Sequence, residues 1–161
     1  WEESARVPLV VVPAKSQGKQ FGKAGQLCSK PVGLIDLYPT MLEMCGLPAK
    51  KSNQGDSLVP LLRNPSADWR FATLTTYARG NHSLRSERHR YLRFEDGSEE
   101  LYDHADDPNE WINLAARPKY AKLLKQFRRE LPTKEAPYHP AVRSGAVNAW
   151  FAEHLRRHGV K

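Results

Sequence analysis

The sequence predicts an α/β fold that carries, as a separate part, a small antiparallel sheet with a helix packed on it. Three observations lead to this prediction: a continuous apolar run at residues 7–12, several short β-forming segments between 72 and 102, and an amphipathic helical pattern at 119–131. Continuous apolar runs are typical of strands buried on both faces, whereas alternation of period two indicates half-buried antiparallel strands.

The composition is ordinary for a globular chain of 161 residues, with 40% hydrophobic and 27% charged residues. Twelve prolines and ten glycines favour a loop-rich fold over a helical bundle. The net charge of +7 is spread over both halves, which favours an anionic partner only weakly; a solvated basic surface is the simpler interpretation. No run of 18 apolar residues occurs, so no membrane span is predicted.

The apolar run at 7–12 is predicted to be a strand that ends at Pro13. A strand of this kind needs neighbours on both sides, and nothing earlier in the sequence can supply them. The first residue is Trp1 rather than Met. We therefore expect the chain to be cut from a larger α/β protein.

A helix is predicted over 36–45, where apolar side chains recur at helical spacing after a polar loop. Asp36 is expected to cap its N-terminus, Pro39 lies in the first turn, and Gly46 suits the left-handed position after the last turn. A short helical turn is predicted at 57–63, followed by a strand at 72–77. The inward residues of the turn are expected to be Leu58, Leu61 and Leu62.

A three-stranded meander is predicted next, with strands at 83–85, 91–94 and 100–102. Asp96-Gly97 predicts a type I′ turn between the last two strands. A helix is then predicted at about 119–131, followed by a tail at 133–161. The tail has a weak helical pattern at Val147, Trp150, Phe151 and Leu155.

Several familiar catalytic and metal-binding signals are missing from the sequence. Glycine-rich phosphate loops, HExxH and GxSxG do not occur, and a Ser/His/Asp triad has no specific support. Cys28 and Cys45 form no CxxC pair. A single disulfide between them is compatible with the sequence, but Cys45 is expected to pack on the apolar helical face. A metal is compatible with the acidic run that ends at Pro108, but turn formation is the favoured interpretation. The run comprises Asp103, His104, Asp106 and Asp107.

The segment 80–85 is the candidate for binding. His82 follows Gly80-Asn81, where the chain can turn sharply, and Arg85 lies three residues on. A His and an Arg together suit an anionic group. The alternative, a His satisfied by backbone and an Arg on the sheet surface, carries equal weight. Asn81-His82-Ser83 is also a formal glycosylation sequon.

Several separated motifs resemble the C-terminal third of formylglycine-dependent sulfatases, and most closely the iduronate-2-sulfatase-like bacterial branch. The resemblance covers residues 1–131. The motifs are WEESARVPL, VGLIDLYPTMLE, LRS followed by HRYLRF, ELYD, and DPNEWINL.

The resemblance implies an alkaline-phosphatase-like α/β fold, of which this chain is the C-terminal part. Residues 1–70 are then expected to end the large mixed-sheet domain, with the strand at 7–12 and the helix at 36–45 packed in or on that sheet. Residues 71–132 are expected to form the small C-terminal subdomain, an antiparallel sheet plus helix. Residues 133–161 are expected to be an extension beyond it.

The resemblance also implies hydrolysis of sulfate esters, and the expected substrate is a sulfated sugar or glycan. Calcium and formylglycine are expected in the parent protein, but the C-x-P/A-x-R signature fits neither Cys28 nor Cys45. No catalytic or metal residue is therefore assigned to this chain, which is expected to be inactive alone. It is expected to contribute fold and pocket rim, with His82, Arg85 and Asn81 contacting the substrate.

The expected partners are a sulfated carbohydrate and the missing N-terminal part of the same protein, with no nucleic acid and no membrane span. The family resemblance implies a periplasmic or secreted location. An alternative is a stand-alone polyanion-binding module, for sulfated glycan or nucleic acid, that performs no catalysis. The two hypotheses differ in whether sulfate is released.

Overall fold

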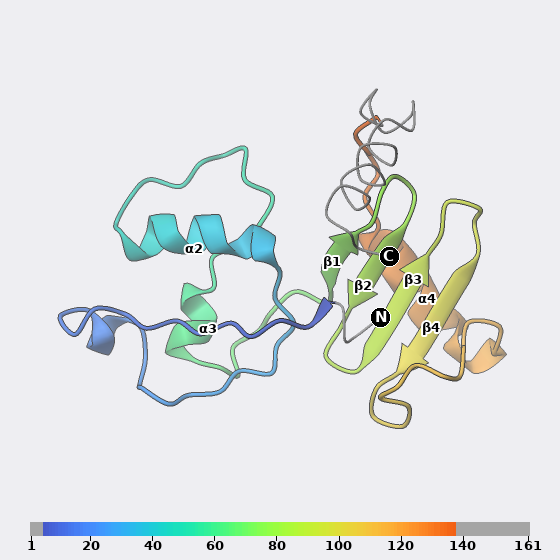
Figure 1. The fold of residues 1–161 in the computed structure, drawn as a ribbon, viewed down its shortest axis with the longest axis horizontal. Helices are drawn as coiled ribbons and strands as arrows, with labels where there is room; N and C mark the ends of the chain where they lie inside the picture. The colour runs from blue at the N-terminus through green and yellow to red at the C-terminus, as the bar shows by residue number, and fades with distance from the viewer. Residues whose placement is uncertain (1–4, 138–161) are drawn as a thin grey trace, which may run out of the picture.

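The computed structural model describes residues 5–137, which form a helical part and a sheet part side by side (Figure 1). The short helices are a consequence of frequent prolines and glycines, which interrupt each periodic segment. The elements are η1 (Gly18–Gln20), η2 (Leu34–Asp36), α2 (Leu37–Met44), α3 (Val59–Arg63), β1 (Thr73–Thr76), β2 (His82–Arg85), β3 (His89–Arg93), β4 (Glu99–Asp103), η3 (Pro118–Tyr120) and α4 (Ala121–Glu130).

The four strands form one antiparallel sheet in the order β1-β2-β3-β4. Leu74, Leu84, Tyr91 and Leu101 are paired across neighbouring strands and therefore lie on one face. The helix α4 covers this face (Figure 1). The predicted meander and helix are thereby confirmed.

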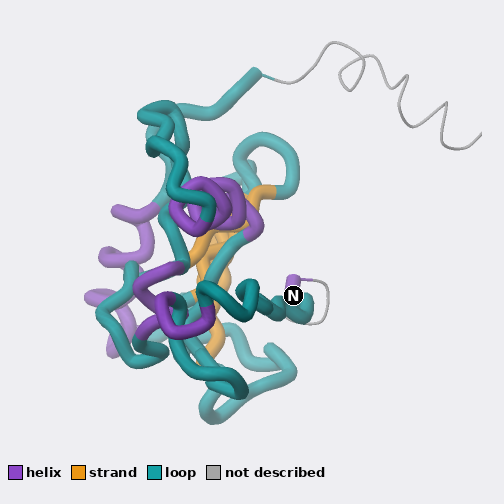
Figure 2. Tube along the Cα trace, turned by 90° about the vertical axis from the view of Figure 1, so that its left-hand side faces the viewer, coloured by secondary structure: helices purple, strands orange, loops and turns teal. Residues whose placement is uncertain are grey.

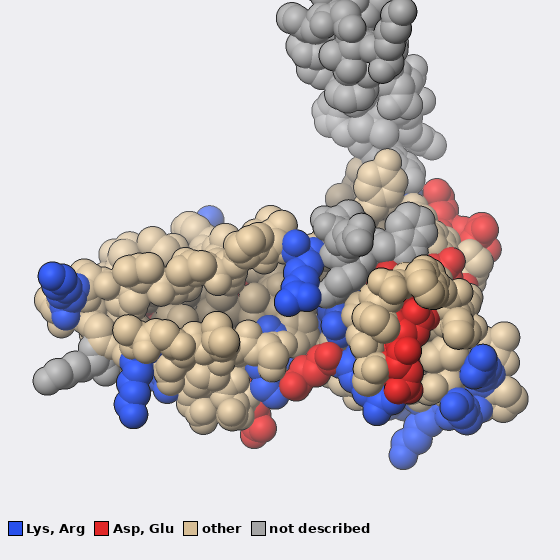
Figure 3. Space-filling model, turned by 60° about the horizontal axis from the view of Figure 1, so that its bottom comes forward, with Lys and Arg blue, Asp and Glu red and all other residues tan. Residues whose placement is uncertain are grey.

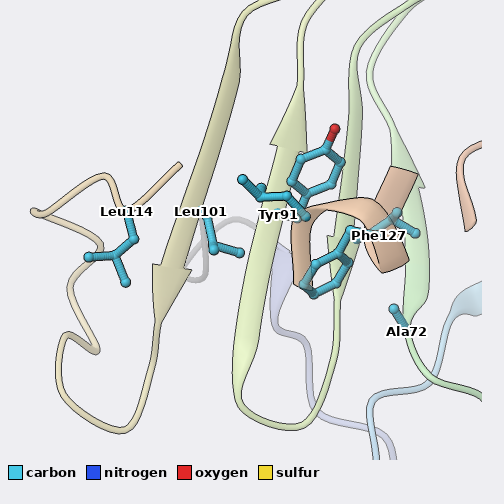
Figure 4. Packing of buried hydrophobic residues seen from close by; sticks show 7 residues of the cluster. Ala72, Tyr91, Leu101, Leu114 and Phe127 are labelled. Carbon is cyan, nitrogen blue, oxygen red and sulfur yellow. The ribbon is translucent and has the colours of Figure 1, made fainter. Parts of the chain in front are cut away.

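The core between α4 and the sheet is centred on Phe127, which is fully buried (Figure 4). Its ring stacks on that of Tyr91, with centroids 5.4 Å apart, and lies 4.8 Å from that of Phe71. Aromatic pairs at these distances stabilise a core beyond the effect of buried area alone. The remaining buried members of the cluster are Ala72, Leu84, Leu101, Leu114 and Leu124.

A charged contact also holds α4 to the sheet edge. Arg128 donates two hydrogen bonds to the Glu99 carboxylate, at 2.8 and 2.5 Å, and the Tyr91 hydroxyl donates a third at 2.6 Å. The hydrogen bond from Arg128 lowers the pKa of Glu99 to about 2, against the opposing effect of burial. The two-pronged contact fixes the rotation of α4 on the sheet.

The turn between β3 and β4 differs from the predicted type I′ turn. Gly97 has a φ of +86°, but Asp96 does not lie in the positive-φ region. Gly97 N donates to Phe94 O at 2.9 Å, and Phe94 N donates to Ser98 O at 3.0 Å. These bonds define a three-residue type I turn followed by a glycine bulge. Asp96 is stabilised there as an acceptor for Ser98, which removes the need for positive φ.

The predicted strand at residues 7–12 is not formed among the described residues. These residues form neither helix nor strand, and Val10 and Val12 are 80% and 85% exposed. A strand exists only through hydrogen bonds to a neighbour, and no described strand lies in register with this run. The apolar side chains are consequently left on the surface.

The predicted helix at 36–45 is confirmed as η2 followed by α2, but its apolar face is not covered within the described residues. Leu34 is 73% exposed, Ile35 50%, Tyr38 54% and Met41 57%. Cys45 is exposed as well, which corrects the expectation that it packs. On the face shown in Figure 3, this part of the molecule consists mostly of uncharged residues.

Asp36 was predicted to cap α2, but its side chain makes no capping hydrogen bond to that helix. It is instead a fully buried hydrogen-bond acceptor. Its carboxylate accepts hydrogen bonds from Gly33 N at 2.8 Å, from Asp56 N at 3.0 Å and from Arg70. Burial raises the pKa of Asp36, but these hydrogen bonds outweigh it and the pKa is lowered. One carboxylate thus joins α2 to two loops.

The helical part is joined to the sheet part through the loop at Pro31. Its carbonyl accepts from Trp69 Nε1 at 3.1 Å and from Thr73 Oγ1 at 2.8 Å. Lys30 forms an ion pair with Glu87 at 2.7 Å in the turn after β2. In Figure 2, which is viewed from the side of the helical part, α2 and α3 lie in front of the strands.

The domain boundary at residue 70 stays a prediction, and the helical pattern at 147–155 lies outside the described residues.

Candidate functional site

The predicted binding segment is the turn between β1 and β2 and the first residues of β2. Ala78 and Gly80 have φ values of +58° and +76°, so the chain reverses sharply there. Asn81 spans two loops, donating from Nδ2 to Arg79 O at 3.0 Å and accepting from Glu95 N at 3.3 Å. Its amide therefore holds the turn against the β3–β4 loop.

His82 is the first residue of β2, which fits its place directly after the turn, and its side chain is buried. Its Nδ1 lies 3.0 Å from Thr76 Oγ1 and its Nε2 lies 2.8 Å from Glu135 Oε1. The second oxygen of Glu135 accepts from Gly80 N at 3.0 Å. The hydrogen bond with His82 is the main cause of the lowered pKa of Glu135. A ligand could reach either ring nitrogen only by displacing one of these groups.

Arg85 lies on the opposite face of the sheet from His82, because side chains alternate along β2. The guanidinium donates to Ser86 O, and its second nitrogen lies 3.0 Å from His104 Nδ1. The structure therefore does not bring the two predicted binding residues together. Any contact that both make with one ligand would have to reach around the sheet.

The face that holds Arg85 carries a charged network that the sequence reasoning missed. Glu110 Oε1 lies 2.6 Å from Arg90 Nε and 2.8 Å from His104 Nε2. Arg90 also donates to Ser83 Oγ at 3.1 Å. The Arg90 and Glu110 side chains are only 3% and 2% exposed. The sequence held one indication of this network: the alternation in HRYLR places Arg90 on the face of the strand that is opposite to the face of Tyr91.

The acidic run after β4 forms turns, as predicted. Asp103 accepts two hydrogen bonds from Arg88, at 2.7 and 2.6 Å, and hydrogen bonding with Arg88 is the main cause of its lowered pKa. Asp107 accepts from the backbone of Trp111 and Ile112, at 3.1 and 2.8 Å. Within residues 5–137 no group of three or more His, Cys, Asp or Glu side chains could hold a metal ion.

A shallow depression lies beside the binding segment and is lined by Asn81, Phe94, Glu95, Asp96 and Ser98. Two carboxylates on its wall repel an anion. The depression itself is therefore a poor site for a sulfate group.

The family of the N-sulphoglucosamine sulphohydrolase C-terminal region matches residues 1–136. A "Sulfatase" of Formosa agariphila is 33% identical over 161 residues, which is 99% of this chain and 30% of that protein. A "Delta 4,5-hexuronate-2-O-sulfatase" of Bacteroides thetaiotaomicron is 31% identical over 80% of this chain and 28% of its own length.

A solved structure, described as being in complex with its substrate D-glucosamine-2-N,6-O-disulfate, is similar with a TM-score of 0.54 and 27% identity. The match covers 70% of this chain and 25% of that one. The chain thus spans about a third or less of the proteins to which it is similar. No helix among the described residues is long and apolar enough to cross a membrane.

Proposed function

The chain belongs to the sulfatase family, whose C-terminal region it matches, and on this premise we propose that its protein hydrolyses sulfate esters of a sugar or glycan. The observation that carries the proposal is the family match over 136 residues, together with the sheet-and-helix geometry shared with a sulfated-sugar complex. Because the chain spans a minor share of each relative, the activity is proposed for the whole protein and not for this chain alone.

The exposed apolar surface supports a role for this chain as one part of a larger body. Val10, Val12, Leu34 and Met41 are each more than half exposed, although apolar side chains of this size are usually buried. We propose that the run at 7–12 gains strand neighbours from the rest of the sulfatase, and that the α2 face packs there. This packing would supply the hydrogen-bond partners that the run lacks among the described residues.

The cofactors expected from the family do not fit the described residues. No cluster of potential ligands for calcium exists within 5–137, and neither Cys28 nor Cys45 lies in a formylglycine signature. We propose that the metal and the nucleophile are held elsewhere in the protein. This chain is proposed to contribute fold and pocket rim.

Within the predicted binding segment, we propose different roles for the three residues. Arg85 is proposed to contact the sugar or an adjacent anionic group, because its side chain is only partly buried and its guanidinium can bind an anion with two parallel hydrogen bonds. His82 and Asn81 are proposed to position the turn, since each already bridges two segments. His82 and Arg85 lie on opposite faces of the sheet, so only Arg85 is proposed to face the ligand.

The test is sulfate release by the full-length protein from a panel of sulfated monosaccharides. We expect Arg85→Ala to raise KM at least about tenfold with a smaller effect on kcat, because a lost charged contact costs on the order of 1.5–3 kcal/mol. Arg63→Ala is the matched control, since that guanidinium is about half exposed in the helical part. Unchanged KM in Arg85→Ala would remove Arg85 from the rim; absence of any turnover would overturn the proposed function.

The alternative of a polyanion-binding module without catalysis retains support from the net charge of +7. Its distinguishing result is salt-sensitive binding of sulfated glycan without sulfate release. A periplasmic or secreted location accompanies the sulfatase proposal, and fractionation of the source cells tests it.

A further inference from the structure

We propose that the solvent face of α4 binds a sulfated polysaccharide chain outside the catalytic pocket and holds polymeric substrate there. The surface consists of Lys122, Lys125 and Arg129, which we call the α4 basic stripe. The inference rests on the proposed function for the identity of the ligand. It adds that the protein acts on polymers and engages them at a second surface.

The charges of this part of the chain are segregated along the sequence. From Arg117 to Arg129 there are six Lys or Arg residues and no Asp or Glu. From Phe94 to Glu110 there are eight Asp or Glu residues and no Lys or Arg. A basic surface that serves only solubility needs no such separation, because interspersed signs serve equally well.

The helix directs the three cations of the stripe to one side. Leu124 and Phe127 are buried against the sheet, whereas Lys122, Lys125 and Arg129 are exposed. Spacings of three and four residues place these three on one helix face, opposite the buried one. Lys122 and Arg129 are seven positions apart, or about 10 Å along the axis at 1.5 Å per residue. Cations in a row on a straight helix match a linear, repeatedly charged ligand.

Several other basic residues of the sheet part are paired with carboxylates, whereas the residues of the stripe are not. Arg128 is bound to Glu99, and Arg88 to Asp103. Among residues 5–137, no carboxylate lies within 4.0 Å of any cation of the stripe. The same helix therefore carries one arginine that holds the fold and three cations free of an acidic partner in the described part of the chain.

The chemistry of α4 favours a sulfated glycan over two other polyanions. A helix that binds an anionic membrane inserts an apolar face, but the apolar residues of α4 are committed to the sheet core. Sequence-tolerant binding of single-stranded nucleic acid uses exposed aromatic rings for stacking, and the stripe has none. A sulfated polysaccharide requires neither apolar insertion nor stacking.

The test compares a triple variant of the full-length protein, Lys122→Ala/Lys125→Ala/Arg129→Ala, with a charge-matched control. The control, Lys15→Ala/Lys50→Ala/Lys51→Ala, removes three exposed cations from the helical part. Binding to heparin is measured against salt concentration, with N- and O-desulfated heparin, single-stranded DNA and phosphatidylglycerol vesicles as competing ligands. Turnover of a sulfated monosaccharide is measured in parallel.

We expect the stripe variant to bind heparin at least about tenfold more weakly, with the slope of log K against log salt smaller by about 2, at roughly 0.7 per lost cation. Monosaccharide turnover should remain within about twofold of wild type. The control should keep wild-type heparin binding. Preserved monosaccharide turnover with lost heparin binding separates this inference from the proposed function.

Equal loss in the control and the stripe variant would overturn the inference, as would undiminished heparin binding by the stripe variant. Competition by DNA or vesicles as strong as that by heparin at equal charge would also overturn it, since the surface would then have no preference for sulfated glycan. Circular dichroism of the triple variant identifies unfolding. If the helix is lost, Lys122→Gln/Lys125→Gln/Arg129→Gln provides the same test with long polar side chains.

Discussion

Glu110→Gln is the substitution that examines the buried charge network most sharply. Glu110 has a φ of +58° and a side chain that is 2% exposed, with Oε1 2.6 Å from Arg90 Nε. Gln keeps the size and backbone preference of Glu and removes only the charge. Arg90 is then left as a buried cation without its nearest counterion.

The expected cost follows from the burial of both groups. Removing one member of a buried ion pair costs about 3–5 kcal/mol, because the remaining charge stays in a medium that solvates it poorly. His104 contacts the same carboxylate oxygen at 2.8 Å, and Gln leaves it only a neutral amide oxygen as acceptor. We therefore expect a loss of at least about 3 kcal/mol in the free energy of unfolding.

The assay is urea unfolding followed by tryptophan fluorescence, with Asp106→Asn as the control. Asp106 also meets a guanidinium, at 3.4 Å from Arg88, but its side chain is 78% exposed, so we expect a change of no more than about 1 kcal/mol. In the double variant Arg90→Met/Glu110→Gln, the two effects should be non-additive by at least about 1 kcal/mol. A change below about 1 kcal/mol in Glu110→Gln would refute the reasoning.

Three further changes test the packing and charge of the sheet part. Phe127→Ala should cost about 3–5 kcal/mol in urea unfolding, because it empties a fully buried site against Tyr91; a cost below about 1 kcal/mol would contradict the assigned core. Gly97→Ala should cost about 1 kcal/mol from positive φ alone, since the added Cβ meets nothing closer than 3.8 Å, and a stabilised variant would contradict the turn.

The third is a pH prediction: the pKa of Glu99 is lowered from 4.5 to about 2, so its stabilising contribution is complete above pH 4.5 and is lost as pH falls toward 2. Glu99→Gln should flatten the stability curve in that window, and an unchanged slope would count against the contact with Arg128.

The sheet part could be predicted from the sequence because its signals are local. Period-two alternation at 91–94 and the apolar spacing at 120–131 each predict one apolar face, and that face is buried in β3 and in α4; β3 also buries Arg90 on its other face, which the alternation does not predict. The turn type at Asp96-Gly97 was missed because Asp96 acts as an acceptor for Ser98, which the dipeptide rule does not consider. Side-chain acceptors select turn geometry as effectively as glycine does.

The helical part was harder to predict because its signals refer to partners outside the described residues. An apolar run such as residues 7–12 indicates burial, but it does not say by what. Asp36 was expected at a helix cap from its position, whereas its actual partners lie 20 and 34 residues away. Contacts of this range depend on the tertiary fold and leave no periodic pattern in the sequence.

The candidate site shows the same limit. The position of His82 at the start of β2 could be predicted from Gly80-Asn81, but its partner Glu135 lies 53 residues further along the chain. The opposite faces of His82 and Arg85 follow from odd spacing along one strand, and the sequence already contained that information. The pairing of Arg90 with Glu110, like that of His82 with Glu135, required the structure.

The most direct test of the central claim is sulfate release, measured by ion chromatography, from sulfated monosaccharides incubated with the full-length protein and separately with this 161-residue chain. If the chain supplies fold, rim and the α4 basic stripe while the nucleophile lies elsewhere, the full-length protein releases sulfate and the chain alone releases none. Release of sulfate by the purified 161-residue chain would contradict the account.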